Sequence, residues 1–264
     1  MTTMEPIRSI VLLGAGNVAF HLGTAFKQAG LDVLQVYSRT MHSAKILAHT
    51  LGCQATNQLS ELTPGADIYI ISVTDDAIAD VVREFPHHGS FLVHTSGSIS
   101  IDVLSACTDR YGVFYPLQTF SKGISIDYTS IPVCLESVQE TDSTGLERFA
   151  RLMTNSVHWV NSDKRRQLHI AAVFACNFVN HMYAMAADVA GSAALPFELL
   201  RPLIRETARK ALMAEPQTVQ TGPARRKNHK VIETHLSLLS GSQSLQRMYK
   251  LISEDIMNTY LGKE

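Results

Sequence analysis

The sequence lacks the features that mark several large protein classes. It has four cysteines, none in a CxxC spacing, so neither a metal-binding motif nor a disulfide framework is indicated. No unbroken apolar run approaches the roughly 20 residues of a membrane span, and the N-terminus lacks a basic segment followed by an apolar one. No basic stripe with interleaved aromatics suggests nucleic-acid binding. We therefore expect a cytoplasmic protein that binds no metal, membrane or nucleic acid.

The composition is that of a chain able to bury a substantial core. Of its 264 residues 45% are hydrophobic and 18% are charged, and the formal net charge is −1. Residues 1–161 hold 9 Lys and Arg against 15 Asp and Glu, whereas residues 162–264 hold 14 against 9. This split suits an anionic ligand between the halves or over the second, although charges on solvated helix faces explain it as well.

The most informative stretch follows an apolar, strand-like run at residues 7–13. Gly14 permits a tight turn and Gly16 lets a pyrophosphate approach the backbone, while Ala19 still allows close helix–strand packing, as in the GxGxx(G/A) fingerprint. The first amides of the helix expected at residues 17–29 then favour a bound phosphate. The predicted phosphate contacts are Gly14, Gly16, Asn17 and Val18. The alternative is a strand-to-helix turn without a ligand.

The end of the next predicted strand, residues 32–38, bears on the choice of cofactor. An NAD site usually places Asp or Glu about 20 residues beyond the glycines, where the carboxylate binds the ribose 2′-hydroxyl. Here the chain reads Tyr37-Ser38-Arg39-Thr40, without a carboxylate. Ser38, Arg39 and Thr40 can instead hold a 2′-phosphate through charge-assisted hydrogen bonds. The prediction is therefore NADP, with an ordinary solvated turn as the alternative for Arg39.

Further apolar runs continue the predicted sheet. Strands are expected at residues 67–73, 91–94, 111–115, 131–135 and 157–160, with helices at 43–51 and 144–155 and another that begins at Thr74 or Asp75. Ligands gather at the carboxyl ends of parallel strands, so Val73 and Thr74 are predicted to contact the cofactor near the adenosine. Helix capping is a sufficient structural alternative for Thr74.

The pattern changes after residue 161. Long helices are expected at about residues 164–190, 196–214, 230–239 and 244–261, separated by turns rich in Gly and Pro. We therefore predict an α/β fold, with an N-terminal Rossmann-type doubly wound parallel sheet over residues 1–161 and a C-terminal all-helical domain over residues 162–264.

Several motifs spread over nearly the whole chain resemble those of proteins that combine a Rossmann-like domain with a DUF2520 domain. They are Gly14-Ala15-Gly16-Asn17-Val18-Ala19, His94-Thr95-Ser96-Gly97-Ser98, Tyr115-Pro116-Leu117-Gln118-Thr119-Phe120, His169-Ile170-Ala171-Ala172 with Asn177, and Thr221-Gly222-Pro223-Ala224-Arg225. The resemblance implies an NADP oxidoreductase distantly related to pyrroline-5-carboxylate reductase, ketopantoate reductase and the β-hydroxyacid dehydrogenases. It also implies that the helical domain supplies part of the active site and a homodimer interface.

By the same resemblance, two loops flank the nicotinamide and the substrate. The backbone amides of Ser96 and Gly97 are expected to bind a substrate carboxylate or a cofactor phosphate, and Gln118 with Thr119 to contact the nicotinamide carboxamide. A plain turn is the alternative for Ser96 and Gly97.

One departure from the distant relatives concerns the proton donor. The β-hydroxyacid dehydrogenases carry a Lys four residues before an Asn on the first long helix of the second domain, whereas here Val173 precedes Asn177 by four. His169, Asn177, Asn180 and His181 instead follow one stripe at helical spacing. His169 is the predicted proton donor and Asn177 the predicted orienting amide. Hydrogen bonding within an interdomain or dimer interface is the alternative role.

Together these features predict an NADP-dependent protein that transfers a hydride between NADPH and a small, anionic carbonyl or imine substrate, and the resemblance implies that it is a homodimer. Two alternatives stay open. One is a non-catalytic, NADP(H)-sensing regulatory dimer, which the missing lysine favours, and the other is a Rossmann protein that uses a different nucleotide.

Overall fold

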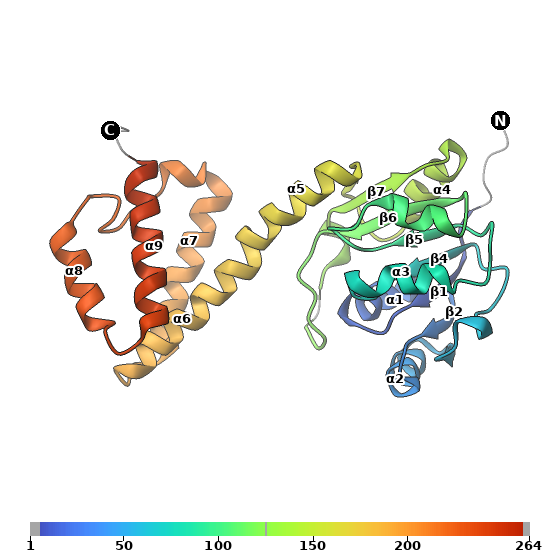
Figure 1. The fold of residues 1–264 in the computed structure, drawn as a ribbon, viewed down its shortest axis with the longest axis horizontal. Coiled ribbons are helices and arrows are strands. Elements are labelled where there is room, and N and C mark those ends of the chain that lie inside the picture. The colour runs from blue at the N-terminus through green and yellow to red at the C-terminus, as the bar shows by residue number, and fades with distance from the viewer. Residues whose placement is uncertain (1–5, 125, 261–264) are drawn as a thin grey trace. The chain divides into compact units, whose positions relative to one another are not determined.

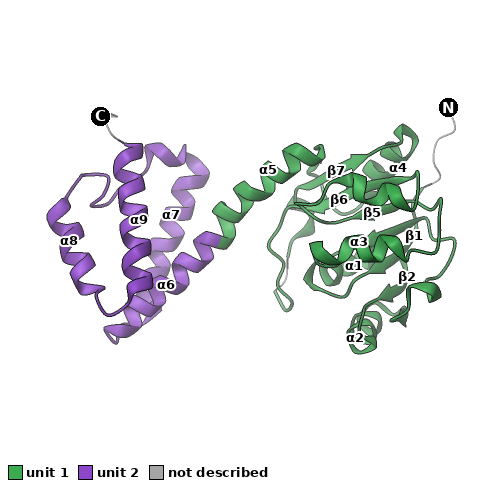
Figure 2. Cartoon of the chain, in the orientation of Figure 1, with its two compact units in different colours: residues 1–177 green, residues 178–264 purple. Residues whose placement is uncertain are grey.

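The computed structural model describes residues 6–124 and 126–260. Contacts within the chain divide it into two compact units, residues 1–177 and residues 178–264 (Figure 1, Figure 2). The first unit contains the sheet, and the second consists of helices and turns.

The described part of the first unit is built on one eight-stranded sheet with the order β3-β2-β1-β4-β5-β6-β7-β8. The strands are β1 (Ser9–Leu13), β2 (Asp32–Tyr37), β3 (Gln54–Thr56), β4 (Ile68–Ile71), β5 (Leu92–His94), β6 (Tyr111–Pro116), β7 (Val133–Ser137) and β8 (Val157–Trp159). β1 pairs in parallel with β2 on one side and β4 on the other, so the strand order reverses there. In open sheets of this kind the crevice at such a point, outside the carboxyl ends of the strands, is the usual ligand site.

Helices cover both faces of the sheet. They are α1 (Asn17–Gln28), α2 (Met41–Leu51), α3 (Asp75–Arg83) and α4 (Glu140–Arg151). Phe26 of α1 and Phe149 of α4 belong to the core cluster on one face, whereas Ile78 of α3 belongs to the cluster on the other. Because both faces are covered, the central strand β4 is buried along its whole length. The predicted α/β, doubly wound architecture is confirmed.

The sheet differs from the prediction in two respects. β3 is a three-residue edge strand in a segment expected to be a loop, and it is too short to give a periodic signal. β7 pairs antiparallel with β6, so the sheet is mostly rather than wholly parallel. A parallel pairing needs a long crossover connection, whereas the described residues between β6 and β7 contain one short 3₁₀ turn and no α-helix.

The first helix after the sheet belongs to the first unit. α5 (Ser162–Ala172) continues through a π-helical segment, Val173–Phe178, into α6 (Val179–Ser192). The fully buried guanidinium of Arg165 fixes α5 to the sheet, because it pairs with Glu136 of β7 and donates to the Ile99 carbonyl. The sequence pattern changes after residue 161, whereas the contacts within the chain divide the two units after Asn177.

The π-helical segment interrupts the predicted stripe of polar residues. A π-turn holds more residues than an α-turn, so positions on either side of it lose the regular α-helical spacing. Asn177, Asn180 and His181 are all exposed.

The second unit confirms the predicted helical character of this part of the chain. Besides α6 it contains α7 (Arg201–Met213), α8 (His229–Leu238) and α9 (Gln243–Thr259). The predicted end of the last helix, at residue 261, lies outside the described residues. The continuous helical run Ser162–Ser192 has the length and apolar composition of a membrane span. A single such helix is weak support for a membrane protein, since helices of soluble proteins meet the same criteria.

Candidate functional site

The turn after β1 depends on the absence of a side chain at Gly14. Its φ is +134°, a backbone conformation that favours glycine, and its N–H donates to the Tyr37 carbonyl over 2.8 Å. A Cβ at this position would lie 2.2 Å from the carbonyl oxygen of Ser72. Gly14 therefore lets β1, β2 and β4 approach one another closely at their carboxyl ends.

Gly16 has the opposite environment, because a Cβ there would meet nothing within 4 Å. It caps the start of α1, whose first amides have no acceptor within the helix. The Asn17 side chain donates to the Phe120 carbonyl over 2.9 Å. The turn thus combines open space with several hydrogen-bond donors.

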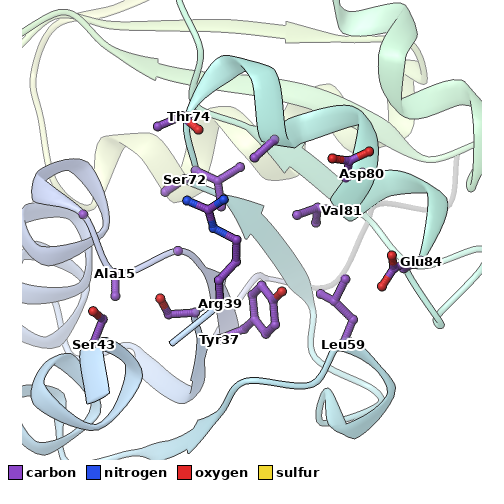
Figure 3. Close-up of a pocket in the computed structure, with 15 residues that line it drawn as sticks. Ala15, Tyr37, Arg39, Ser43, Leu59, Ser72, Thr74, Asp80, Val81 and Glu84 are labelled. Atoms are coloured by element: carbon purple, nitrogen blue, oxygen red, sulfur yellow. The ribbon is translucent and has the colours of Figure 1, made fainter. Parts of the chain in front are cut away.

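A cavity of about 430 Å³, here called the β1–β4 cavity, opens beside this turn (Figure 3). Its lining includes six of the predicted cofactor contacts, namely Gly14, Gly16, Ser38, Arg39, Val73 and Thr74. These residues follow three different strands, β1, β2 and β4, and meet at the point where the strand order reverses.

Arg39 extends into the β1–β4 cavity from the end of β2, whereas Asp80 and Glu84 approach it from α3 (Figure 3). Among the described residues, no carboxylate forms an ion pair with Arg39. The hydroxyl-bearing residues Ser38 and Ser43 line the same cavity. A guanidinium without a carboxylate partner, next to serines, suits a phosphate group.

Four further residues of this lining are not among the predicted contacts, although their spacing carries a signal. Ala77, Asp80 and Val81 of α3 and Glu84, the C-cap residue of that helix, all line the cavity and follow one face at helical spacing. Thr40, in contrast, was predicted as a contact but does not line the cavity. Its hydroxyl caps α2 by accepting from the Ser43 amide and donates to the Ser43 hydroxyl over 2.8 Å.

A second group of residues lies at the carboxyl ends of β5 and β6, and we call Gly97, Tyr115 and His169 the His169 cluster. The hydroxyl of Tyr115 is 3.0 Å from Nδ1 of His169, and a Cβ added to Gly97 would lie 2.6 Å from the same nitrogen. Tyr115 is 9% exposed, whereas His169 is half-buried. Burial raises the pKa of Tyr115 to about 12.

The loop after β5 is held by buried polar groups. The Ser96 amide donates to Nδ1 of His94 over 3.1 Å, and the Ser96 hydroxyl accepts from the amides of residues 98–99. Burial, followed by the charge of Arg165, lowers the pKa of His94 to about 3, so its ring is a neutral acceptor. The amide of Gly97 has no acceptor among the residues that the structure describes.

Hydrogen bonds of the Thr95 hydroxyl connect the two regions along the edge of the sheet. The Thr95 hydroxyl donates to the Ile71 carbonyl over 3.2 Å and to the Ser72 hydroxyl over 3.4 Å. Ser72 lines the β1–β4 cavity, and Thr95 begins the loop that contains Gly97. The cavity and the His169 cluster are therefore neighbouring parts of one strand edge.

The remaining predicted residues are more exposed. The Gln118 side-chain oxygen accepts from the Thr119 amide over 2.8 Å, so its NH₂ group is the part that faces outward. Asn177 lies in the π-helical segment and is exposed. Across residues 6–124 and 126–260 no group of three or more His, Cys, Asp or Glu is arranged to hold a metal ion.

Two family descriptions match the chain. Residues 2–118 match a Rossmann-like domain, and residues 131–256 match a domain of unknown function, DUF2520. No match is found among curated proteins.

Several solved structures are similar to this chain over nearly its whole length. A putative NADP oxidoreductase from Bacteroides fragilis is 42% identical, with a TM-score of 0.89, over 97% of this chain and 100% of that one. An imine reductase from Myxococcus stipitatus in complex with NADP+ is 18% identical, with a TM-score of 0.66, over 96% and 99% of the two chains. A pyrroline-5-carboxylate reductase from Coxiella burnetii is 15% identical, with a TM-score of 0.57, over 95% and 98%.

Proposed function

Because this chain belongs to the family of proteins that join a Rossmann-like domain to a DUF2520 domain, we propose that it is an NADP-dependent oxidoreductase for small carbonyl or imine compounds. The observation that carries this proposal is the β1–β4 cavity, which combines an open glycine turn with an Arg39 that forms no ion pair with a carboxylate of the described residues. A pyrophosphate and a 2′-phosphate are the two anionic parts of the adenosine half of NADP. The descriptions of the similar structures, which name NADP and imine reduction, support the same conclusion.

The residues present fit this cofactor. Gly16 and the first amides of α1 would hold the pyrophosphate, Arg39 with Ser38 would hold the 2′-phosphate, and Val73 and Thr74 would border the adenosine. NADPH, when bound, supplies the hydride. The chain's tasks are then to align the reactants, to exclude water and to provide a proton.

His169 is the proposed proton donor. Its Nδ1 is occupied by the Tyr115 hydroxyl, so Nε2 is the ring nitrogen that remains for a substrate oxygen or nitrogen. Asn177 is the proposed orienting amide, and its exposure in the π-helical segment keeps it accessible to a ligand.

We place the anionic group of the substrate at the loop after β5. The Gly97 amide has no acceptor among the described residues, and the buried hydrogen bonds around Ser96 hold this loop in position. A carboxylate could accept a hydrogen bond from that amide. Gln118, whose oxygen is already used by Thr119, would offer its NH₂ group to the nicotinamide carboxamide.

A homodimer is part of this proposal. Ile170, Phe174 and Phe178 are 52%, 64% and 49% exposed and lie on the helical run Ser162–Ser192. Large apolar side chains clustered at the surface usually mark an interface. A second copy of the chain would cover them, and Phe174→Glu should then give a monomer in sedimentation, whereas Gln167→Glu on the same helix should not.

The function is tested by binding and turnover on the same preparation. Calorimetry should show NADPH binding, and a panel of keto and imino acids with their uncharged analogues should show NADPH consumption that favours the anionic members. Binding without turnover of any compound would favour the NADP(H)-sensing dimer. Binding of another nucleotide, such as an adenosyl donor, in place of NADPH would overturn the proposal.

A further inference from the structure

Tyr115 pairs with the proposed proton donor from the neighbouring strand. It lies near the carboxyl end of β6, its side chain is 9% exposed, and its hydroxyl is 3.0 Å from Nδ1 of His169 on α5. The rings meet edge to face, with centroids 6.0 Å apart. A buried tyrosine hydroxyl needs a hydrogen-bond partner, and here that partner is the proposed proton donor.

The space for this contact is made by a third residue. A Cβ at Gly97 would lie 2.6 Å from Nδ1 of His169 and 2.9 Å from Cζ of Tyr115, closer than side chains pack. Gly97 has no positive φ, so its backbone conformation does not itself require glycine. The absence of a side chain at residue 97 is therefore explained by the room that the Tyr115–His169 pair occupies.

We infer that Tyr115 is a positioning residue for the proton donor: its hydroxyl holds Nδ1 of His169, so that the ring presents Nε2 to the reacting atom. This inference rests on the proposed function. It gives Tyr115 a role that neither the motif containing it nor the comparisons assign.

The hydroxyl suits this role because it can accept as well as donate a hydrogen bond. When the imidazolium gives its Nε2 proton to the substrate, the N–H···O bond from Nδ1 to Tyr115 is kept, and the ring does not rotate. In the balanced reaction, the carbonyl or imine carbon receives the hydride of NADPH and the oxygen or nitrogen receives the proton of Nε2. The products are an alcohol or amine and NADP+, and water restores the proton on the imidazole.

A neutral partner also differs chemically from the carboxylate that orients histidine in many enzymes. A carboxylate would stabilise the imidazolium and hold back its proton, whereas a phenol does so much less. Burial, opposed by the charge of Arg165, raises the pKa of Tyr115 to about 12, so the phenol stays neutral. Asp75, Cys134 and Cys176 are the other titratable groups whose charges act on this hydroxyl.

The test compares Tyr115→Phe with Tyr111→Phe. Tyr111 lies on the same strand and the same face of it, but has no hydrogen bond to His169. In Tyr115→Phe, kcat should fall by about 3- to 10-fold, the effect of one net hydrogen bond, while KM and the NADPH dissociation constant stay within about twofold. In Tyr111→Phe all three should keep their parent values.

A second readout does not depend on turnover. At a pH where His169 is protonated, its Nδ1 proton should give a low-field NMR resonance that exchanges slowly with water. This resonance should be lost in Tyr115→Phe and kept in Tyr111→Phe. Gly97→Ala, which should push the ring away from Tyr115 without removing either side chain, should also lose it.

The outcomes separate this inference from the proposed function. Loss of the resonance with an unchanged kcat would show that the hydrogen bond exists but does not position the donor, and a resonance kept in Tyr115→Phe would show that the bond does not exist. Either result overturns the inference. If the parent protein consumes no NADPH with any substrate, the proposed function fails, and with it the catalytic role of Tyr115, while the resonance still reports on the pairing.

Discussion

The β1–β4 cavity and the His169 cluster share one strand edge but are assembled in different ways. The glycine turn and Arg39 belong to a single βαβ unit, between β1 and the start of α2. The His169 cluster joins the loop after β5, the end of β6 and a helix 54 residues further along the chain. The first arrangement is fixed by local chain geometry, whereas the second exists because Arg165 anchors α5 to the sheet.

This difference in assembly predicts that the two regions have separate functions. Substitutions in the β1–β4 cavity should change cofactor binding, and substitutions in the His169 cluster should change turnover at constant cofactor affinity. A substitution that alters both quantities, or the wrong one, would show that the two regions are not separate.

The largest effect is expected from Gly16→Val, which should abolish NADPH binding and leave the fold intact. The added branch would occupy the space where the pyrophosphate approaches the turn, yet a Cβ there meets no atom of the protein within 4 Å. Calorimetry and thermal unfolding of the same sample check both parts. An unchanged dissociation constant in the folded variant would show that the turn is only structural.

Gly14→Ala is the variant to compare with Gly16→Val, because it places the smallest side chain at the other glycine of the turn. Its φ of +134° and the 2.2 Å approach of a Cβ to the Ser72 oxygen both predict a loss of stability. A lower melting temperature in Gly14→Ala but not in Gly16→Val would confirm that one glycine serves the fold and the other the ligand.

The next largest effect is expected from His169→Ala. General acid catalysis is typically worth ~10²–10⁴-fold, so turnover should fall by about that factor while NADPH affinity hardly changes. The alkaline limb of the pH–rate profile should disappear. His158→Ala, which removes an exposed histidine on β8, is the control.

A purely structural role for His169 predicts a different result. The variant would then melt at a lower temperature or dissociate as a dimer, while the folded protein kept near-normal activity per site. Turnover, melting temperature and sedimentation, measured on one sample, distinguish the two roles.

The parts of the fold that can be predicted from the sequence are those in which residues close together in the chain are also close together in space. The strand, glycine turn and helix at β1 and α1, and the basic residue after β2, follow from spacing alone. The edge strand β3 and the antiparallel turn into β7 were missed, because three residues show no period and strand direction is set by the connection.

Some residues of the candidate site can likewise be predicted from the sequence, and others cannot. Asp80 and Glu84 could have been found from their spacing on α3, although nothing in the sequence says which face of that helix meets the cavity. Tyr115 ends an apolar strand and resembles a core residue in its pattern. Its pairing with His169 follows only from the docking of α5, and the π-helical segment that displaces Asn177 has no local sequence signature.

A smaller effect is expected from Arg39→Ala, which should remove most of the preference for NADP(H) over NAD(H). A bidentate, charge-assisted contact is worth ~1.5–3 kcal/mol, which is about a 10- to 150-fold change in affinity. Calorimetry with both cofactors measures this preference. Lys45→Ala, an exposed cation on α2 that does not line the cavity, should keep it. Equal affinities for the two cofactors in the parent protein would contradict the assignment.

The smallest expected effect is a pH-dependent change in stability caused by His94, which holds the loop after β5. Burial, followed by the charge of Arg165, lowers the pKa of His94 from 6.5 to about 3. The unfolded chain therefore binds this proton more readily than the folded chain does. The stability that neutral His94 contributes is complete above pH 6.5 and is lost as the pH falls from 6.5 towards 3.

His94→Asn tests this contribution, because its side-chain oxygen can still accept from the Ser96 amide while the titration is removed. Between about pH 7 and pH 5.5 the free energy of unfolding of the parent protein should fall by about 1 kcal/mol more than that of His94→Asn. Denaturant unfolding at the two pH values measures the difference, with the exposed His158→Asn as a control that should behave like the parent. If the parent and His94→Asn lose equal stability, His94 is not held neutral by the fold. Weaker NADPH binding by His94→Asn would show that the loop after β5 contributes to cofactor binding as well as to the position of the proton donor. The β1–β4 cavity and the His169 cluster would then not be functionally separate at this loop.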